Sequence, residues 1–236
     1  MNILALDTSG TVAGIALFRK GHLSYEAYLD HKLTHSEVLL PMTEQGLMLA
    51  GLKMDEIDCF VCCTGPGSFT GVRIGVSTVK AFAYGLSKPV MGVNTLDALA
   101  YNVVAHKGTI CAMMDARRAQ VYAAQYRSDG KSLSRIGDYE ALSAEACTSR
   151  WAGQEGILLV GDGAQANRAL LTEKGQGVRF APPHLIRQRA AAAGALAMNR
   201  LSDGAQLQSP FSLEPIYLRL PQAEREYQRK QRENLG

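Results

Sequence analysis

Short apolar runs separated by turns dominate the start of the chain. The runs at residues 2–6, 11–18 and 23–29 each have strand length and are joined by tight turns, so they predict a three-stranded meander. A fourth run, at residues 57–63, predicts a strand that ends in the turn Gly65-Pro66-Gly67. The proline fixes its own φ angle and the glycines permit positive φ angles, so regular structure has to stop there.

A helix is predicted directly after this glycine turn. Ser68 or Thr70 provides a capping hydroxyl, and the helix is expected to end near residue 85. Gly71 and Gly75 share one face of it. Since each interior glycine costs about 1 kcal/mol relative to alanine, this face indicates close approach by another backbone. The residues by themselves leave open whether that backbone belongs to this chain or to a partner.

Another helix is predicted before the glycine turn, from Thr34 to about Ala50. Thr34 and Glu37 fit a capping box, and Gly51 provides the C-terminal stop. Pro41 should kink this helix, because its ring removes one hydrogen bond. The apolar residues of the helix cover more than one stripe, namely Val38, Leu39, Leu40, Met42, Leu47, Met48 and Leu49. A helix that is apolar on more than one side has to bury more than one side, so this one needs a contact beyond its own sheet.

The chain beyond Pro89 continues the alternation of strands and helices. A strand at 89–93 is followed by a helix that Asn94 caps and that runs to about Ala105. A second set of strands then begins, so we expect two domains, at residues 1–105 and 106–236. The other elements predicted in the second domain are strands at 109–114, 119–126 and 157–160, a turn-rich region at 128–134, helices within 143–151, 164–174 and 190–201, an extended segment at 211–220 and a charged tail from residue 222.

Composition places the chain among ordinary globular proteins. It has 236 residues, of which 47% are hydrophobic and 20% charged, and its net charge of +3 does not indicate a broad nucleic-acid surface. No apolar run approaches the ~18 residues of a transmembrane helix, and the first residues do not resemble a signal peptide, so we expect a cytoplasmic protein without a membrane partner. The five cysteines suit a reducing compartment. Cys59 and Cys62 should point to opposite faces of one strand, which predicts buried thiols and not a metal or redox pair.

Three short motifs suggest ligand chemistry. His31 and His35 have the spacing of helical metal ligands, but the capping box places His31 before the helix, so we expect no metal site. Asp7-Thr8-Ser9-Gly10 ends a strand and suits a turn that holds a phosphate or a metal-bound water, although plain turn chemistry explains it too. Residues 161–166 fit the dinucleotide pattern, but residues 181–184 lack the acidic residue it needs. A plain tight turn or a degenerate nucleoside loop remains.

Several segments carry a resemblance to a known family. They are Ile3 to Ser9, His35-Ser36-Glu37 with Leu39-Leu40-Pro41, Thr64 to Gly75, Asp115 to Arg118 with Val121-Tyr122, and Pro215 to Arg219. In this order, and over nearly the whole chain, they resemble the TsaB (YeaZ) family. The resemblance implies an α/β fold of two tandem actin/hexokinase/Hsp70-like (ribonuclease H-like) domains with mixed sheets.

The same resemblance implies a function. Members of the family act with TsaE and with TsaD, the catalytic protein that makes N6-threonylcarbamoyladenosine beside the anticodon of tRNA. The metal-binding histidines of TsaD fall on Thr95 and Leu99 here, and neither supplies an imidazole. Residues 115–118 stand where TsaD has a glycine-rich phosphate turn. The resemblance therefore implies a non-catalytic subunit that binds TsaD, contacts tRNA indirectly and has no metal or cofactor. The alternative is an ATP-dependent transferase or metallopeptidase-like enzyme in its own right.

Two sets of residues follow as candidate functional residues. In this family the helix that starts at His35 and the helix after the glycine turn form the face that meets TsaD, which implies the partner-interface residues His35, Ser36, Leu39, Leu40, Met42, Gly71, Arg73, Ile74, Gly75 and Thr78. A free chain would expose this face, so homodimerisation through it is a further expectation. Nucleotide or phosphate contacts would fall on Asp7, Thr8, Ser9, Arg117, Arg118, Gly161 and Gly163. The two adjacent arginines either present guanidinium groups to phosphate or form a solvated turn.

Overall fold

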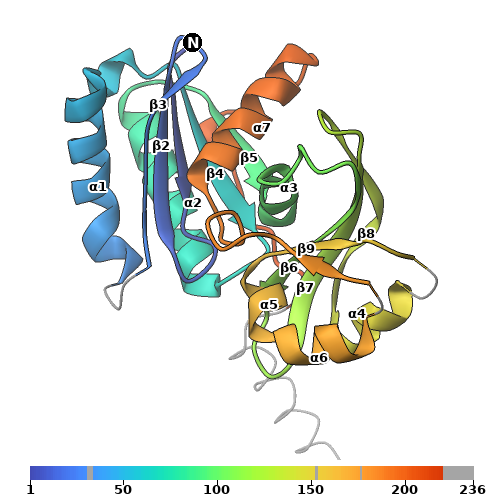
Figure 1. Ribbon diagram of the computed structural model, residues 1–236. Coiled ribbons are helices and arrows are strands. Elements are labelled where there is room, and N and C mark those ends of the chain that lie inside the picture. Colours follow the sequence, from blue (N-terminus) through green and yellow to red (C-terminus); the bar gives the residue numbers. More distant parts are fainter. Residues whose placement is uncertain (31–33, 152–153, 176, 220–236) are drawn as a thin grey trace, which may run out of the picture.

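Two five-stranded mixed sheets form the framework of the molecule (Figure 1). The computed structural model describes residues 1–30, 34–151, 154–175 and 177–219 of the chain. The first sheet has the strand order β3–β2–β1–β4–β5, and the second has the order β10–β9–β6–β7–β8. Because each sheet contains parallel and antiparallel pairs, the predicted α/β class with mixed sheets is confirmed.

The first sheet contains the predicted meander. Its strands are β1 (Ile3–Asp7), β2 (Ala13–Arg19), β3 (His22–Leu29), β4 (Cys59–Gly65) and β5 (Val90–Asn94). The first three run antiparallel to one another, whereas β4 and β5 run parallel to β1. Cys59 packs into the core on one side of the sheet and Cys62 into the core on the other, as the period of a strand predicts.

Helices cover both faces of the first sheet. On one face lie α1 (His35–Ala50) and α2 (Phe69–Gly85), and on the other lie α3 (Thr95–Tyr101) and α7 (Ala190–Ser202). The predicted caps are present: Glu37 accepts a hydrogen bond from the Thr34 backbone at 2.7 Å, and Ser68 accepts one from the Gly71 amide at 3.3 Å. Asn94 caps α3 in the same way. Of the two hydroxyls considered for α2, it is therefore Ser68 that caps the helix.

The second sheet is built from the later part of the chain. Its strands are β6 (Gly108–Asp115), β7 (Gln120–Ser128), β8 (Leu133–Ser143), β9 (Leu158–Val160) and β10 (Arg179–Phe180). The helices α4 (Ala144–Arg150) and α6 (Arg168–Lys174) cover its outer face, and α5 (Asp162–Ala166) follows β9 directly. Helix α3 packs between the two sheets, because Ala98 enters the core of the first while Leu96 and Leu99 enter the core of the second.

Three local predictions were wrong. The strand β8 was not predicted, because none of its residues is buried and they lack an alternating apolar pattern. The helix expected over 164–174 is two short helices, α5 and α6, which break at Asn167, whose side chain donates to the Gly163 carbonyl at 2.9 Å. Helix α3 ends at Tyr101, earlier than residue 105.

The described C-terminal residues return to the first sheet. Helix α7 packs on its inner face through Ala190, Ala193 and Ala197. Residues 205–219, which we call the C-terminal strap, include the short helix η2 (Pro210–Ser212) and pair with the edge of β5 through two Val90–Gln208 backbone bonds of 2.9 Å. The division into domains 1–105 and 106–236 stays a prediction, although α7 and the strap pack on the first sheet. Within the residues described, no helix is both long and apolar enough to span a membrane.

Candidate functional site

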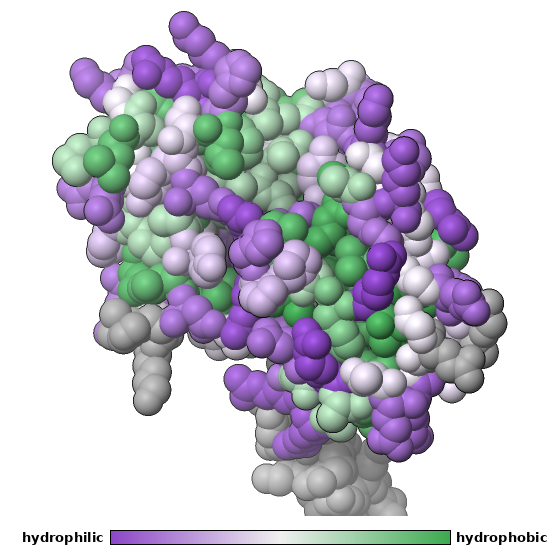
Figure 2. Space-filling view, viewed as in Figure 1, coloured by the Kyte–Doolittle hydropathy of each residue, from purple (hydrophilic) through white to green (hydrophobic). Residues whose placement is uncertain are grey.

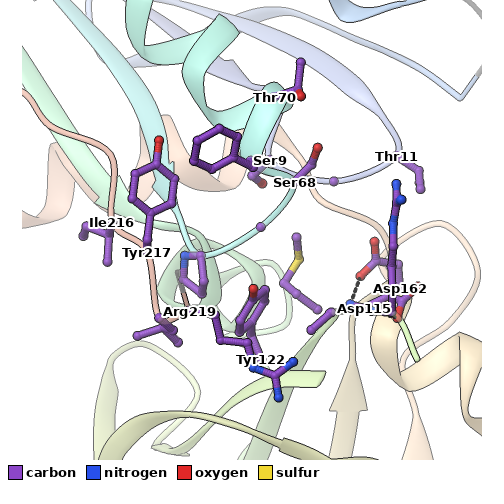
Figure 3. Close-up of a pocket in the computed structure, with 18 residues that line it drawn as sticks. Ser9, Thr11, Ser68, Thr70, Asp115, Tyr122, Asp162, Ile216, Tyr217 and Arg219 are labelled. Carbon is purple, nitrogen blue, oxygen red and sulfur yellow. Dashed lines mark hydrogen bonds between the residues drawn. The ribbon is translucent and has the colours of Figure 1, made fainter. Parts of the chain in front are cut away.

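A cavity of about 390 Å³ lies where the two halves of the chain meet (Figure 3). One wall of the cavity comes from the β1–β2 turn and the start of α2. The facing wall comes from β6, β7, α5 and the C-terminal strap. We call it the cleft cavity. Its polar and aromatic lining residues are Ser9, Thr11, Ser68, Phe69, Thr70, Asp115, Arg117, Tyr122, Asp162, Tyr217 and Arg219.

The β1–β2 turn presents only part of its predicted phosphate motif to this cavity. Asp7 is 2% exposed, and its Oδ1 accepts hydrogen bonds from the Ser9 amide at 2.9 Å and the Ser9 hydroxyl at 2.6 Å. Burial raises the pKa of the Asp7 carboxyl, and the bonds from Ser9 oppose that rise. All three predicted contacts in this turn are buried, and of them only Ser9 is among the residues that line the cavity.

The glycine face of α2 packs on this same turn, which corrects a prediction. Gly71 and Gly75 are buried, and a Cβ atom on Gly71 would lie 2.1 Å from the Thr8 carbonyl oxygen. One on Gly75 would lie 2.5 Å from Thr8 Oγ1, and that hydroxyl donates to the Gly71 carbonyl at 2.7 Å. The backbone that approaches these glycines is therefore this chain's own. Their assignment to a partner interface is wrong, as is that of Leu39, which is 1% exposed in the core.

The turn between β6 and β7 holds the predicted arginine pair in an unusual conformation. Arg117, Arg118 and Ala119 have φ angles of 62°, 55° and 55°, in the left-handed region that residues other than glycine seldom adopt. The turn is fixed by the Arg117 amide, which donates to Asp115 Oδ1 at 2.8 Å. Arg117 lines the cleft cavity, whereas Arg118 is exposed and is not part of the lining.

The segment after β9 contributes a residue that the sequence did not reveal. A Cβ atom on Gly161 would lie 2.0 Å from the Met113 carbonyl oxygen, and one on Gly163 would lie 2.7 Å from the Met114 carbonyl carbon. Both glycines thus allow close packing on β6, and neither lines the cleft cavity, which corrects their prediction as phosphate contacts. Asp162 between them lines the cavity and accepts from the Asp115 amide at 3.0 Å (Figure 3). Burial raises the pKa of Asp162.

The C-terminal strap completes the cavity and holds the start of α2. Its Ile216 amide donates to the Thr64 carbonyl at 2.7 Å, and Tyr217 accepts a hydrogen bond from Arg73 Nε at 2.9 Å. The Arg73 guanidinium lies 3.9 Å from the centre of the Phe69 ring. Neither Tyr217 nor Arg219 was a candidate residue, and the only signal for them was the 215–219 segment that carried the family resemblance.

A second feature, distinct from the cavity, is an exposed apolar surface on α1. Leu40, Met48 and Leu49 are 54%, 71% and 61% exposed, and Figure 2 shows apolar side chains among polar ones over this helix at the left of the view. We call these three residues, with the exposed Ser36 and Arg73, the α1–α2 face. Of the other predicted interface residues, His35, Met42, Ile74 and Thr78 are half-buried, and His35 Nε2 lies 2.9 Å from the Gly10 carbonyl oxygen.

The positions that the resemblance aligns with metal ligands lie in the core. Thr95 and Leu99 are 0% and 1% exposed, and Leu99 packs among apolar side chains. His31 lies outside the described residues. No group of three or more His, Cys, Asp and Glu side chains in the described part of the chain is arranged to hold a metal ion.

The nucleotide implied by the fold does not fit the residues of the cleft cavity. Asp7, which would face a metal-bound phosphate, turns its carboxylate into the core. The cradle that Gly161 and Gly163 would offer to a nucleoside is filled by the backbone of β6. The lining holds two arginines, Arg117 and Arg219, but Asp115 and Asp162 add two carboxylates, so the charged side chains of the lining do not favour a phosphate.

Comparison with known proteins gives a consistent relationship. The family model described as TsaD, tRNA N6-adenosine threonylcarbamoyltransferase, matches residues 31–227. A protein of Haemophilus influenzae named tRNA threonylcarbamoyladenosine biosynthesis protein TsaB is 30% identical over 233 residues, which cover 93% of this chain and 94% of that protein. The protein of the same name from Escherichia coli is 33% identical over 183 residues, 76% of this chain and 79% of that one.

Solved structures agree with these relatives. YeaZ from Pseudomonas aeruginosa has a TM-score of 0.78 at 26% identity and covers 92% of this chain and 99% of that one. The activator of 2-hydroxyisocaproyl-CoA dehydratase from Clostridium difficile, solved with bound ADPNP, has a TM-score of 0.53 at 12% identity and covers 92% of this chain and 99% of that one. At this identity the likeness shows the fold alone. The predicted actin/hexokinase/Hsp70-like fold class is thereby confirmed. Since the family model matches most of the chain and a TsaB relative is 30% identical over 93% of it, the chain belongs to the TsaB (YeaZ) family.

Proposed function

We propose that the protein is a non-catalytic subunit of the complex that forms N6-threonylcarbamoyladenosine beside the anticodon of tRNA, and that it acts by binding TsaD. Its relatives are named for the biosynthesis of this nucleoside. The observation that carries the proposal is the α1–α2 face, whose large apolar side chains have no cover in the described chain. In this proposal the protein works in the cytoplasm, TsaE belongs to the same complex, and tRNA is contacted indirectly.

The geometry of α1 supports a helix-packing contact. Leu40 and Met48 are eight residues apart and share one stripe of the helix, while Pro41 and Leu49 form the adjacent stripe. All four are exposed. The opposite side of α1 is anchored in the core by Val38, Leu39 and Leu47. A partner helix laid along the stripe of Leu40 and Met48 would bury it without disturbing that anchor.

Helix α2 supports the same surface with a fixed cation. Arg73 is exposed, yet its guanidinium is held by the Tyr217 hydroxyl and the Phe69 ring. A charge that is already oriented loses little side-chain entropy on binding, so it contributes to specificity beside the apolar stripes. An acidic side chain of the partner opposite Arg73 would be its complement.

The non-catalytic assignment rests on three positions. The carboxylate of Asp7 is bonded within its own turn, and Thr95 and Leu99 are buried where the resemblance places metal ligands. The alternative is an ATP-dependent transferase or metallopeptidase-like enzyme. A metal analysis and an ATP turnover assay on the isolated chain test it, and one tightly bound zinc or iron per chain, or sustained ATP turnover, would favour the enzyme.

Co-purification with TsaD tests the proposed role directly. Leu40→Glu and Met48→Glu each place a charge in the centre of the proposed contact, where an unpaired charge opposes burial. We expect each to weaken TsaD binding by about 100-fold, or about 2.7 kcal/mol, while the isolated chain melts as before. Leu207→Glu is the matched control, because Leu207 is 36% exposed in the strap and not on α1. Unchanged TsaD binding by both α1 variants would contradict the proposal.

The same face provides a route to self-association of the free chain. An exposed apolar face that normally meets a partner can pair with itself about a two-fold axis. We therefore propose a homodimer in the absence of TsaD, measured by sedimentation at increasing concentration. Met48→Glu should convert it to a monomer, and TsaD should compete with it.

A further inference from the structure

Met48, on the α1–α2 face, is the most exposed methionine of the chain. The sequence holds eight methionines, all within the described residues. Six of them are buried or half-buried, namely Met42, Met54, Met91, Met113, Met114 and Met198. Of the other two, Met48 is 71% exposed and Met1 is 47% exposed. A reagent in solution therefore reaches the thioethers of Met48 and Met1 before those of the other six.

The cysteine thiols do not compete with these two thioethers for an oxidant. All five cysteines lie in the described part of the chain, and none is more than 2% exposed. Burial raises the pKa of every one of the five thiols, to about 12 for Cys59 and Cys147. Since the thiolate is the form that oxidants attack, enclosed and neutral thiols react slowly. The sulfur chemistry available at the surface is therefore that of a thioether.

The surroundings of Met48 keep its side chain apart from the contacts that hold α1. Met48 lies in the last turn of the helix, where its carbonyl oxygen accepts a hydrogen bond from the amide of Gly51, the C-cap, at 3.2 Å. Helix α1 contacts the core through other residues, among them Leu39 and Leu47. A chemical change at the Met48 sulfur would leave these contacts intact. It would change the polarity of the stripe that Met48 forms with Leu40.

From these observations we propose that Met48 is an oxidation site, and that its conversion to the sulfoxide prevents the free chain from binding TsaD. This inference rests on the function proposed above. With hydrogen peroxide as the oxidant, the thioether sulfur attacks one peroxide oxygen, and the S–O bond forms as the O–O bond breaks. The second oxygen takes up the proton and leaves as water. The sulfur loses two electrons and the peroxide gains them.

The sulfoxide disfavours the contact for a physical reason. Oxidation replaces a flexible apolar side chain by a polar one with a hydrogen-bond acceptor. A partner helix laid along the stripe of Leu40 would bury this oxygen without a donor, which opposes binding. A weakening of roughly ten- to hundredfold corresponds to one buried acceptor left unpaired. Methionine sulfoxide reductases reverse the reaction, so the surface would be restored and not lost.

Native oxidation followed by a TsaD titration tests the inference. The full chain is treated with hydrogen peroxide while dilute, so that the proposed homodimer does not cover Met48, and the peroxide is removed before TsaD is added. Peptide mapping by mass spectrometry should show Met48 and Met1 oxidised ahead of the other methionines and of the cysteines. We expect TsaD affinity to fall roughly ten- to hundredfold, to return after treatment with methionine sulfoxide reductases, and the melting temperature to stay unchanged. TsaD bound beforehand should protect Met48 from peroxide.

Variants at this position separate Met48 from the other sulfur atoms. Met48→Leu keeps the apolar volume, so it should bind TsaD as the unaltered chain does and keep that affinity after peroxide treatment, although Met1 is still oxidised. Met48→Gln should bind weakly without any oxidant, because its amide is polar as the sulfoxide is.

Three results would overturn the inference. They are complete oxidation of Met48 with unchanged TsaD affinity, oxidation of Met48 no faster than that of the half-buried methionines, and a loss of affinity that persists in the oxidised Met48→Leu chain. Leu40→Glu then distinguishes the two proposals. If it weakens TsaD binding, the oxidation site alone is wrong, and if Leu40→Glu and Met48→Glu both leave binding unchanged, the proposed function fails with it.

Discussion

Replacing Asp97 by alanine should destabilise the protein strongly, because this carboxylate joins its two halves. Asp97 lies on α3, which packs between the sheets. It accepts hydrogen bonds from the Tyr126 hydroxyl at 2.7 Å and the Tyr139 hydroxyl at 2.8 Å, and it pairs with Arg200 at 2.5 Å. The three partners come from β7, β8 and α7, so one side chain connects the second sheet to the helix that covers the first.

The expected loss follows from the exposure of each partner. Tyr126 is 2% exposed, so its hydroxyl would stay buried and unpaired once the Asp97 acceptor is removed. Leaving that hydroxyl unpaired costs about 2 kcal/mol. Tyr139 is half-buried and the Arg200 side chain is 36% exposed, so water replaces part of what they lose, and together they add about 1 kcal/mol. The free energy of unfolding should therefore fall by about 3 kcal/mol.

Urea unfolding followed by circular dichroism measures this loss. Asp138→Ala, at an exposed carboxylate in β8, is the matched control and should change the free energy of unfolding by less than about 0.5 kcal/mol. In a double-mutant cycle, Asp97→Ala and Tyr126→Phe should be coupled by about 1–2 kcal/mol, since they remove the same hydrogen bond. A loss below about 1 kcal/mol for Asp97→Ala, or strict additivity in the cycle, would refute this reasoning.

Three further predictions follow from the β1–β2 turn and the arginine turn. Gly75→Leu should lower the melting temperature, because overpacking costs about 1–3 kcal/mol or more. Gly85→Leu is the control and should not lower it, because no atom lies within 4 Å of the added Cβ. Equal melting temperatures of the two variants would contradict the internal packing of α2. Because the pKa of Asp7 is raised in the folded chain, the contribution of Asp7 to the free energy of unfolding falls as pH rises from about 4 through that pKa. In unfolding experiments, the stability of Asp7→Asn relative to the unaltered chain should therefore increase with pH. A difference that stays constant with pH would contradict this prediction. Because the proposed function has tRNA contacted indirectly, replacing Arg117 and Arg118 together by alanine should leave tRNA binding by the assembled complex unchanged at low salt, as a solvated turn implies. Weaker binding with a reduced salt dependence would show instead that these arginines contact phosphate.

The elements that could be predicted are those whose signals are local. Thr34 with Glu37, Ser68 and Asn94 each cap the helix that the sequence places after them, because a cap depends on residues a few positions apart. The meander of β1 to β3 follows from apolar runs and tight turns for the same reason. The opposite orientation of Cys59 and Cys62 needs only the period of a strand.

The cleft cavity could be predicted only in part, because its walls come from distant segments. Ser9 and Arg117 were candidates on local grounds, but Asp162, Tyr217 and Arg219 reach the cavity through the second sheet and the C-terminal strap. No periodic pattern marks where such segments meet. The strand β8 was missed for a related reason, since an exposed edge strand needs no apolar alternation.

The glycine face of α2 shows why a sequence pattern can identify a close contact without identifying its partner. Gly71 and Gly75 require a neighbouring backbone, and a helix of a second protein would meet that requirement as well as the β1–β2 turn does. Only the position of Thr8 against both glycines decides between them. The β1–β2 turn and the C-terminal strap both hold the start of α2, through bonds from Thr8 to the Gly71 carbonyl and from Arg73 to Tyr217. Helix α1 lies beside it on the same face of the sheet, so its exposed stripes of Leu40 and Met48 are presented from a rigid base. A surface that needs little rearrangement on binding loses little entropy, which favours the contact with TsaD that we propose.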